Sequence, residues 1–140
     1  MSALIERRAR LARIRRVQHL QAAAQAAQAE GRATSLEDTA AHLAQLCHSL
    51  TPDRGAMAAA QLSNAAELAM RLDTVRNGLR DSIVTARATA VESAARRLEA
   101  RIRQESAERL EERAARALAT VNERKLQASG GRRKSSGTSA

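Results

Sequence analysis

Histidine and cysteine are the side chains of this 140-residue sequence best suited to bind a metal ion or attack a substrate. They are His19, His42, Cys47 and His48. A helical metal site places two ligands about four residues apart on one face, and no pair here has that spacing. No acidic cluster completes a ligand set, no serine or threonine has a neighbouring histidine and acid to activate it, and no GxxxxGK[ST] or GxGxxG loop occurs. The sequence therefore predicts no enzyme, no cofactor and no metal site.

The single cysteine and the hydropathy pattern favour a cytoplasmic protein. Cys47 cannot form an intrachain disulfide and is expected to act as a small apolar residue on a helix face. No apolar run approaches the roughly 18 residues that cross a bilayer, so we expect no transmembrane segment. The basic first residues are not followed by the apolar stretch of a secretory signal.

The composition favours helix over a compact globular core. The chain has no Phe, Tyr or Trp, and 44% of its residues are hydrophobic in a broad count that includes alanine. Aromatic side chains bury the largest areas in cores, whereas Ala, Leu, Arg, Glu and Gln are strong helix formers. A helical periodicity with this composition is typical of long helices and coiled coils.

A first helix is predicted over residues 3–50, with a possible kink at Gly31, where glycine costs about 1 kcal/mol relative to alanine. Its apolar positions recur at helical spacing. They are Leu4, Leu11, Ile14, Val17, Leu20, Ala24 and Ala27, followed by Leu36, Ala40, Leu43, Cys47 and Leu50.

The only proline, Pro52, ends this helix within the stretch TPDRG. Proline lacks the amide hydrogen and disfavours helical geometry in the residue before it, and Gly55 tolerates turn conformations. A break of this length between two periodic segments is typical of an αα-hairpin connection. We therefore predict a turn over residues 51–55.

A second helix is predicted over residues 56–128, followed by a disordered basic tail over residues 129–140. The apolar spacing continues through Asn77-Gly78, which argues against a second turn there. Two spacings of eleven suggest a nearly straight helix in this region. The predicted seam consists of Ala58, Leu62, Ala65, Leu68, Leu72, Val75, Leu79, Ile83, Ala86, Val91, Leu98, Ile102, Leu110, Leu118 and Val121.

These elements together predict an all-α fold, an elongated antiparallel two-helix coiled-coil hairpin with a single domain over residues 3–128. A turn at 51–55 places Leu4 near Ile102, so that residues 103–128 extend past the first helix. The formal net charge of +9 divides into +4 over residues 1–30, zero over 31–100 and +5 over 101–140. Both basic segments then lie at the open end of the hairpin.

A chain of this kind is a candidate for binding rather than catalysis. The basic ends could neutralise phosphates, which keeps a helical nucleic-acid-binding or polyanion-binding protein open as an alternative. Glutamates interleaved with the arginines, and the lack of aromatic residues to stack on bases, argue against nucleic acid. A membrane-surface helix over residues 4–20 and a generic coiled-coil scaffold are further alternatives.

The pattern as a whole resembles the FliJ family of the flagellar type III export apparatus and its YscO-type relatives in virulence systems. The resemblance rests on the basic, leucine-spaced start LIERRARLARIRRVQHLQAAAQAAQAE, a turn just over a third along the chain, a longer second helix, and the charged end RRLEARIRQESAERLEERAARALATVNERKLQ. It covers nearly the whole chain and is a match of length, pattern and charge layout.

The resemblance implies a non-enzymatic stalk that couples an export ATPase to protein export. Its ends would engage the hexameric ATPase, and positions towards the turn would contact an export-gate membrane protein, with export chaperones as further partners. The location implied is cytoplasmic and peripheral at the inner-membrane export apparatus. The ATPase side would include Arg8, Leu11, Arg15, Arg101 and Arg109, and the export-gate side Leu68, Leu72, Val75 and Leu79.

Overall fold

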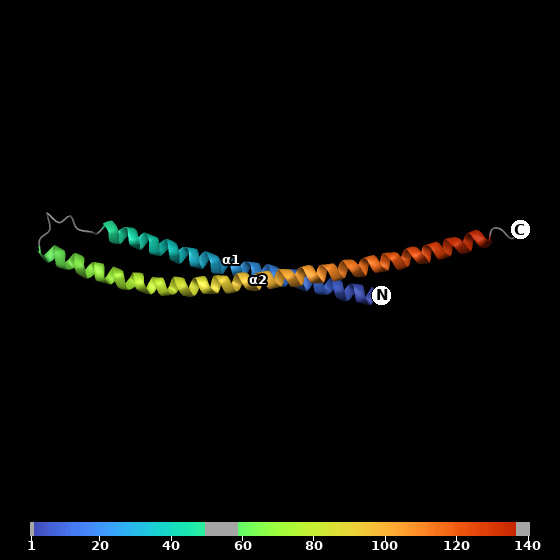
Figure 1. Cartoon of the computed structure of the whole chain (residues 1–140), viewed down its shortest axis with the longest axis horizontal. Coiled ribbons are helices and arrows are strands. Elements are labelled where there is room, and N and C mark those ends of the chain that lie inside the picture. Colours follow the sequence, from blue (N-terminus) through green and yellow to red (C-terminus); the bar gives the residue numbers. More distant parts are fainter. Residues whose placement is uncertain (1, 50–58, 137–140) are drawn as a thin grey trace. The chain divides into compact units, whose positions relative to one another are not determined.

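The computed structural model describes residues 2–49 and 59–136, and over these residues the chain forms two α-helices. Helix α1 spans Ser2–Ser49 and helix α2 spans Ala59–Ser136. The two pack against each other in opposite directions, because early residues of α1 bond late residues of α2 (Figure 1). The prediction of an all-α antiparallel two-helix hairpin is confirmed. The predicted turn at 51–55 lies outside the described residues.

The helices continue through the glycines at which breaks were considered. Helix α1 passes through Gly31 and helix α2 passes through Asn77-Gly78 without interruption. Helix α2 also continues to Ser136, within the predicted tail of 129–140, while 137–140 lie outside the described residues. No proline stops the helix there, and a glycine costs a helix only about 1 kcal/mol. None of the described glycines takes the positive φ that ends many helices.

Two compact units divide the chain, and each contains a segment of both helices. Unit 1 comprises Met1–Gln21 with Arg97–Ala140, and unit 2 comprises Ala22–Arg96. Unit 1 has 17 basic and 7 acidic side chains, a net charge of +10, and unit 2 has 7 basic and 8 acidic, a net charge of −1. The positive charge of the chain therefore belongs to unit 1.

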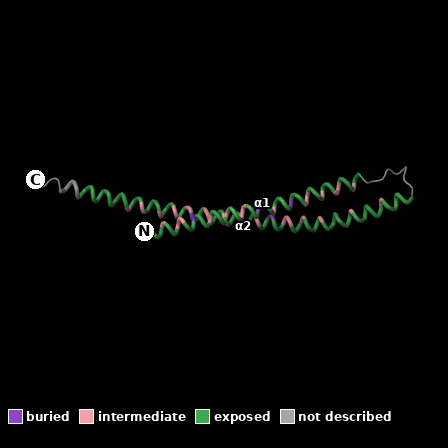
Figure 2. The backbone as a smooth tube through the Cα atoms, turned by 180° about the vertical axis from the view of Figure 1, so that it is seen from behind, coloured by how far each residue is buried: buried purple, intermediate pink, exposed green. Residues whose placement is uncertain are grey.

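Buried and half-buried residues lie on the sides of α1 and α2 that face each other, and they recur every seven residues (Figure 2). On α1 one row follows Ile5, Ala12, His19, Ala26, Ala33, Ala40 and Cys47, and the other Arg8, Arg15, Ala22, Ala29, Leu36 and Leu43. On α2 one row follows Ala65, Leu72, Leu79, Ala86, Ser93, Ala100, Ala107, Ala114 and Val121. Seven is the repeat of a coiled-coil seam.

In unit 2 the seam follows the sequence-based prediction in part, because Ala24, Ala27, Leu62, Leu68, Val75 and Val91, which were also expected in it, are exposed. Leu36, Leu43 and Cys47 of α1 are half-buried, as are Leu72 and Leu79 of α2. Leucine at these spacings excludes enough water to fix which face of each helix turns inward. Leu50 and Ala58 of the predicted seam lie outside the described residues.

In unit 1 the seam differs from the prediction. Most of the apolar residues expected to form it are exposed, from Leu11 at 39% to Leu20 at 67% on α1, with Leu98 and Ile102 on α2. Leu118 and Val121 are half-buried, as predicted. The helices meet instead through small and polar residues, with Ala12 fully buried and Ala107 at 4% exposure. Because each helix keeps the seven-residue phase that the leucines of unit 2 define, alanines fall on the inner face here. Small side chains also allow the two backbones to approach closely.

The register of the hairpin also differs from the prediction. Leu4 was expected near Ile102, but Arg8, one turn further along α1, already bonds Leu110. The half-buried seam of α2 continues to Leu118 and Val121, so α2 does not extend past α1 from residue 103. The prediction assumed a tight five-residue turn, whereas α2 begins at Ala59, and the Arg87 bonds of unit 2 place the end of α1 opposite residues near Leu72.

Within the described part of the chain, neither helix contains a stretch long and apolar enough to cross a membrane.

Candidate functional site

One flank of the seam in unit 2 is closed by a three-residue ion cluster, here called the Arg87 clasp: Arg87, Glu30 and Glu37. The guanidinium of Arg87 donates from Nε and Nη2 to the two carboxylate oxygens of Glu37, at 2.5 and 2.6 Å. Its Nη1 donates to Oε1 of Glu30 at 2.8 Å. A bidentate arginine–carboxylate pair fixes orientation as well as distance. The clasp therefore pins the register of α1 against α2 in unit 2.

Protonation of the clasp follows from these bonds. The hydrogen bonds from Arg87 lower the pKa of Glu37 below its usual range. The bonds to Glu37 and then to Glu30 raise the pKa of Arg87 above its ordinary value. Glu37 is therefore charged at neutral pH.

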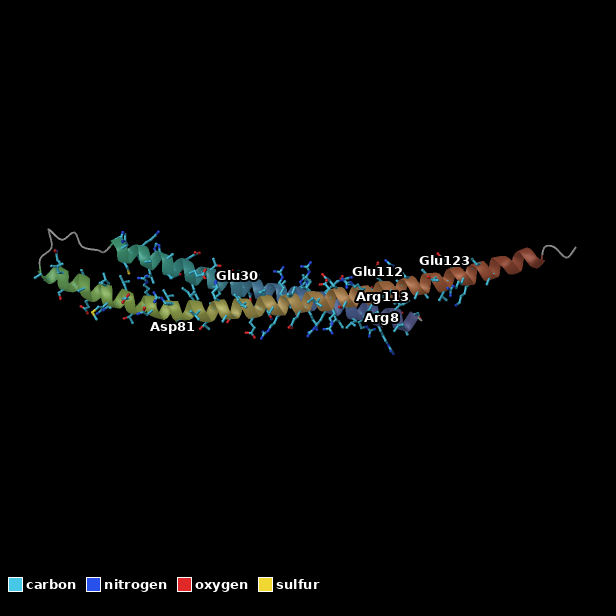
Figure 3. All side chains as sticks on the ribbon, viewed as in Figure 1. Arg8, Glu30, Asp81, Glu112, Arg113 and Glu123 are labelled. Carbon is cyan, nitrogen blue, oxygen red and sulfur yellow. The ribbon has the colours of Figure 1, made fainter. Side chains whose placement is uncertain are left out.

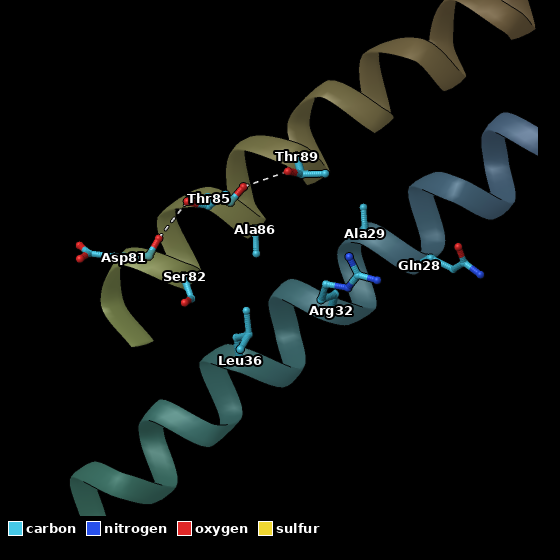
Figure 4. Close-up of a pocket in the computed structure, with 9 residues that line it drawn as sticks. All are labelled: Gln28, Ala29, Arg32, Leu36, Asp81, Ser82, Thr85, Ala86 and Thr89. Carbon is cyan, nitrogen blue, oxygen red and sulfur yellow. Dashed lines mark hydrogen bonds between the residues drawn. The ribbon is translucent and has the colours of Figure 1, made fainter. Parts of the chain in front are cut away.

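The opposite flank of the seam in unit 2 lacks such a closure and contains a hollow of about 460 Å³ between the two helices (Figure 4). Its floor includes Ala29, Leu36 and Ala86, and its rim includes Arg32 and Asp81. The side chain of Asp81 points away from α1, and neither charge forms an ion pair with another described residue. Small residues on both helices leave this space unfilled.

The residues predicted for the export gate divide between two positions. Leu72 and Leu79 are half-buried in the seam against α1. Leu68 and Val75 continue the seven-residue spacing of Ser82 and Thr89, which each precede a seam position, and both remain exposed, Val75 at 52%. The register places Leu46 of α1, 43% exposed, opposite the segment that contains Val75. Sequence reasoning missed Leu46, although its place one residue before the seam residue Cys47 is a readable signal.

We call this second flank the open side of unit 2. Its residues are Arg32, Leu46, Leu68, Val75, Ser82 and Thr89. Arg32 and Leu46 each lie one residue before a seam position of α1. In an antiparallel pair, residues that precede the seam on one helix lie beside those that precede it on the other. The open side thus joins the hollow to an apolar patch near the end of α1.

In unit 1, the cross-helix contacts are polar. Arg8 donates from Nη1 to the carbonyl oxygen of Leu110 at 3.2 Å. Arg16 donates from Nε to Oε1 of Glu108 at 2.8 Å, and Gln104 donates to the same oxygen at 3.0 Å. These bonds lower the pKa of Glu108, and the bond to Glu108 raises the pKa of Arg16. Arg8 and Arg113 are labelled in Figure 3 among the charged side chains of this unit.

The residues predicted for the ATPase side are not equivalent in the structure. Arg8 and Arg15 are half-buried in the seam, where Arg15 bonds Gln18 at 3.0 Å. Arg101 is exposed but pairs with Glu105 at 3.2 Å. Leu11 is exposed, and so is Arg109, which forms no ion pair with any described residue. Of the five, Leu11 and Arg109 are therefore exposed and free of ion pairs with described residues.

Three further arginines of α1 form a more accessible set, here called the arginine stripe: Arg7, Arg10 and Arg13. All three are exposed, and none forms an ion pair with a described residue. A spacing of three residues carries them across the face of α1 directed away from α2. Sequence reasoning missed them because it took the neighbouring Leu11 and Ile14 for the inner face.

The residues with metal or nucleophile chemistry do not assemble into a site. No group of three His, Cys, Asp or Glu side chains among the described residues could hold a metal ion. Cys47 is a free thiol, half-buried in the seam. The Nε2 atom of His19 is buried in the seam of unit 1 without a hydrogen-bond partner among the described residues.

Comparison with known proteins adds no relative: no family model, no curated protein and no solved structure matches this chain.

Proposed function

We propose that this protein is a non-enzymatic coiled-coil stalk of a flagellar or virulence-type export apparatus. Unit 1 binds the hexameric export ATPase, and unit 2 contacts the export-gate membrane protein, so that the chain assists substrate export. Export chaperones are further partners. The protein works in the cytoplasm, peripheral to the inner-membrane export apparatus.

The observation that carries this proposal is the separation of charge between the two units of a two-helix hairpin. Unit 1 has a net charge of +10 and unit 2 a net charge of −1. The arginine stripe leaves Arg7, Arg10 and Arg13 free to pair with carboxylates of a partner, and arginine is the preferred cation at protein interfaces. Unit 2 offers apolar contacts instead, with Leu68 and Val75 exposed. Resemblance to the FliJ family supplies the identity of the partners.

The decisive experiment measures binding of the purified chain to a purified export ATPase hexamer by interferometry. The variant Arg7→Glu/Arg10→Glu/Arg13→Glu should bind at least about tenfold more weakly, because three cations become anions at the contact. The matched control is Arg76→Glu/Arg80→Glu, which reverses two exposed, unpaired arginines of unit 2. This control should bind within about twofold of the unchanged chain.

Binding that is absent, or that the arginine-stripe variant leaves unaltered, would contradict the proposal. Circular dichroism on each variant checks that helix content is unchanged. The original candidates Arg8 and Arg15 are unsuitable for this test, since both lie in the seam and their reversal would disturb packing.

The arginine stripe also favours a second candidate, a polyanion-binding protein. Three unpaired arginines on one exposed helix face can each neutralise a phosphate. Binding to duplex DNA would then fall with salt at a log–log slope of about −0.9 per phosphate contacted. The arginine-stripe variant would lower that slope, while a chain that shows no salt-dependent DNA binding would exclude this candidate.

A further inference from the structure

The open side of unit 2 is a flank of the hairpin on which nothing in the described chain packs. Leu46, Leu68 and Val75 are exposed there, and the hollow lies along the same flank. On the other flank the Arg87 clasp covers the seam. A helix pair with one exposed apolar flank and one flank covered by charged residues is typical of a pair that packs against further helices.

The area that the chain leaves exposed is large enough for such packing. Its accessible surface is 11183 Å² for a mass of 15.1 kDa. A compact monomer of that mass exposes about 7,100 Å². The excess of about 4,000 Å² belongs to the whole chain rather than to the open side alone, and a standard stable interface buries roughly 1,600 Å². Among the described residues the buried core consists of five alanines, so a second layer of helices would supply burial that this hairpin lacks.

The charges of unit 2 indicate what kind of molecule can pack there. The net charge of unit 2 is −1, so two copies of it can approach with little overall repulsion, whereas unit 1 at +10 repels itself. The rim of the hollow offers one cation, Arg32, and one anion, Asp81, both without an ion pair to a described residue. A surface that bears both members of a pair is complementary to a copy of itself, as a two-fold interface requires.

We propose that the open side of unit 2 is a self-association surface, on which a second copy of this chain packs to form a dimer. Leu46, Leu68 and Val75 of the two copies form its apolar centre. Arg32 of each copy pairs with the second copy's Asp81 at the edge of the hollow.

This inference does not rest on the export function, because it concerns the purified chain alone. It does connect to that function, since Leu68 and Val75 belong both to the open side and to the predicted export-gate contact. A dimer would therefore cover the gate-facing residues, and the two interactions would compete.

Sedimentation velocity tests the proposal directly, over chain concentrations from about 1 to about 200 μM. The unchanged chain should shift from monomer to dimer over this range. Leu46→Glu/Val75→Glu should raise the dimer dissociation constant by at least about tenfold, because each copy places two carboxylates in the apolar centre. A chain that stays monomeric throughout would overturn the proposal and leave the open side to a helix of another protein.

The matched control is Met70→Glu/Val84→Glu, which changes two residues of α2 at 73% and 66% exposure that lie off the open side. It should dimerise like the unchanged chain. If it dissociates while Leu46→Glu/Val75→Glu still dimerises, the self-association surface lies on the outer face of α2 and the proposal is wrong. Circular dichroism confirms that both variants remain helical.

Exchanging the charges of Arg32 and Asp81 tests their pairing between the two copies without changing the apolar centre of the interface. Arg32→Glu should weaken the dimer by about fivefold or more, because two acids then face each other across the interface. Arg32→Glu/Asp81→Arg restores opposite charges in both copies and should return the dissociation constant to that of the unchanged chain. A double variant as weak as the single one would contradict the face-to-face arrangement.

Discussion

Units 1 and 2 use the same seven-residue seam but fill it with different side chains. In unit 2, leucines such as Leu36 and Leu79 occupy the seam, and charge appears beside it as the Arg87 clasp. In unit 1, Arg8, Arg15 and His19 occupy seam positions among alanines, while Leu11 and Ile14 remain exposed. Unit 2 is therefore the half in which the sequence specifies the pairing of the helices. In unit 1 the two helices are held together by small residues and by hydrogen bonds.

This difference teaches that burial and partner binding are separated along the chain. The arginine stripe of α1 lies in unit 1, where the seam is weakest in apolar character. An apolar seam of alanines releases little free energy per residue, because burial stabilises in proportion to apolar area, at roughly 25 cal/mol per Å². Unit 1 can thus present charge outward from a seam that adds little burial.

The largest expected effect comes from a carboxylate buried in the seam. Ala33 in unit 2 and Ala12 in unit 1 are both fully buried. Ala33→Asp should lower the free energy of unfolding by about 3 kcal/mol, since the new charge has Glu30 and Glu37 as its helix neighbours and Arg87 is already bonded to both of them. Ala12→Asp should cost about 1–2 kcal/mol, because Arg8 and Arg16 lie one turn away on either side. Urea unfolding followed by circular dichroism measures both.

Ala27→Asp provides the control for this pair, since Ala27 is an exposed position of the same helix. It should cost about 0.7 kcal/mol or less, the difference in helix propensity between alanine and aspartate. If Ala33→Asp and Ala12→Asp lower the free energy of unfolding equally, the seams of units 1 and 2 are electrostatically alike, and the proposed difference between them is wrong.

A smaller effect should follow from loss of the cross-helix ion pairs. Arg87→Gln removes a cation bound to two carboxylates and leaves Glu30 and Glu37 without their shared cation, whereas Arg16→Gln removes one bond, to Glu108. Thermal unfolding should therefore show a Tm lowered by a few degrees for Arg87→Gln and by less for Arg16→Gln. Arg71→Gln, which breaks the pair with Glu67 within α2, should shift the Tm least. The reverse order would mean that the clasp does not fix the register.

The smallest effect concerns pH. The pKa of Glu37 and the pKa of Glu108 are both lowered, by hydrogen bonds from Arg87 and Arg16 respectively. A lowered pKa adds stability that is complete above the ordinary carboxyl range and is lost as pH falls through the folded value. The Tm should therefore fall between about pH 5 and about pH 3. Glu37→Gln and Glu108→Gln should each make that fall shallower, and a pH profile identical to that of the unchanged chain would contradict the assignment.

Much of the fold could be predicted from the sequence, and the candidate surfaces only in part. Helix formers throughout the chain and a single proline predicted two helices, and the leucine spacing placed Leu36, Leu43, Leu72 and Leu79 correctly in the seam. In unit 1 the same reasoning failed, because it ranked Leu11, Ile14 and Val17 by hydropathy and took them for the inner face. Arg8 and Arg15 were accordingly read as free surface charges, and the accessible Arg7, Arg10 and Arg13 were passed over.

By itself, the sequence determined that the chain is helical, that it breaks once, and that its positive charge lies near both ends. These properties follow from local propensity and from composition, which need no partner segment. The tertiary structure alone decided the register and the face that each helix turns inward in unit 1. A rigid helix cannot rotate partway along its length, so the inner face is chosen by the strongest contacts of the whole seam. Here those contacts are the leucines and the Arg87 clasp of unit 2, and the alanines of unit 1 follow their phase.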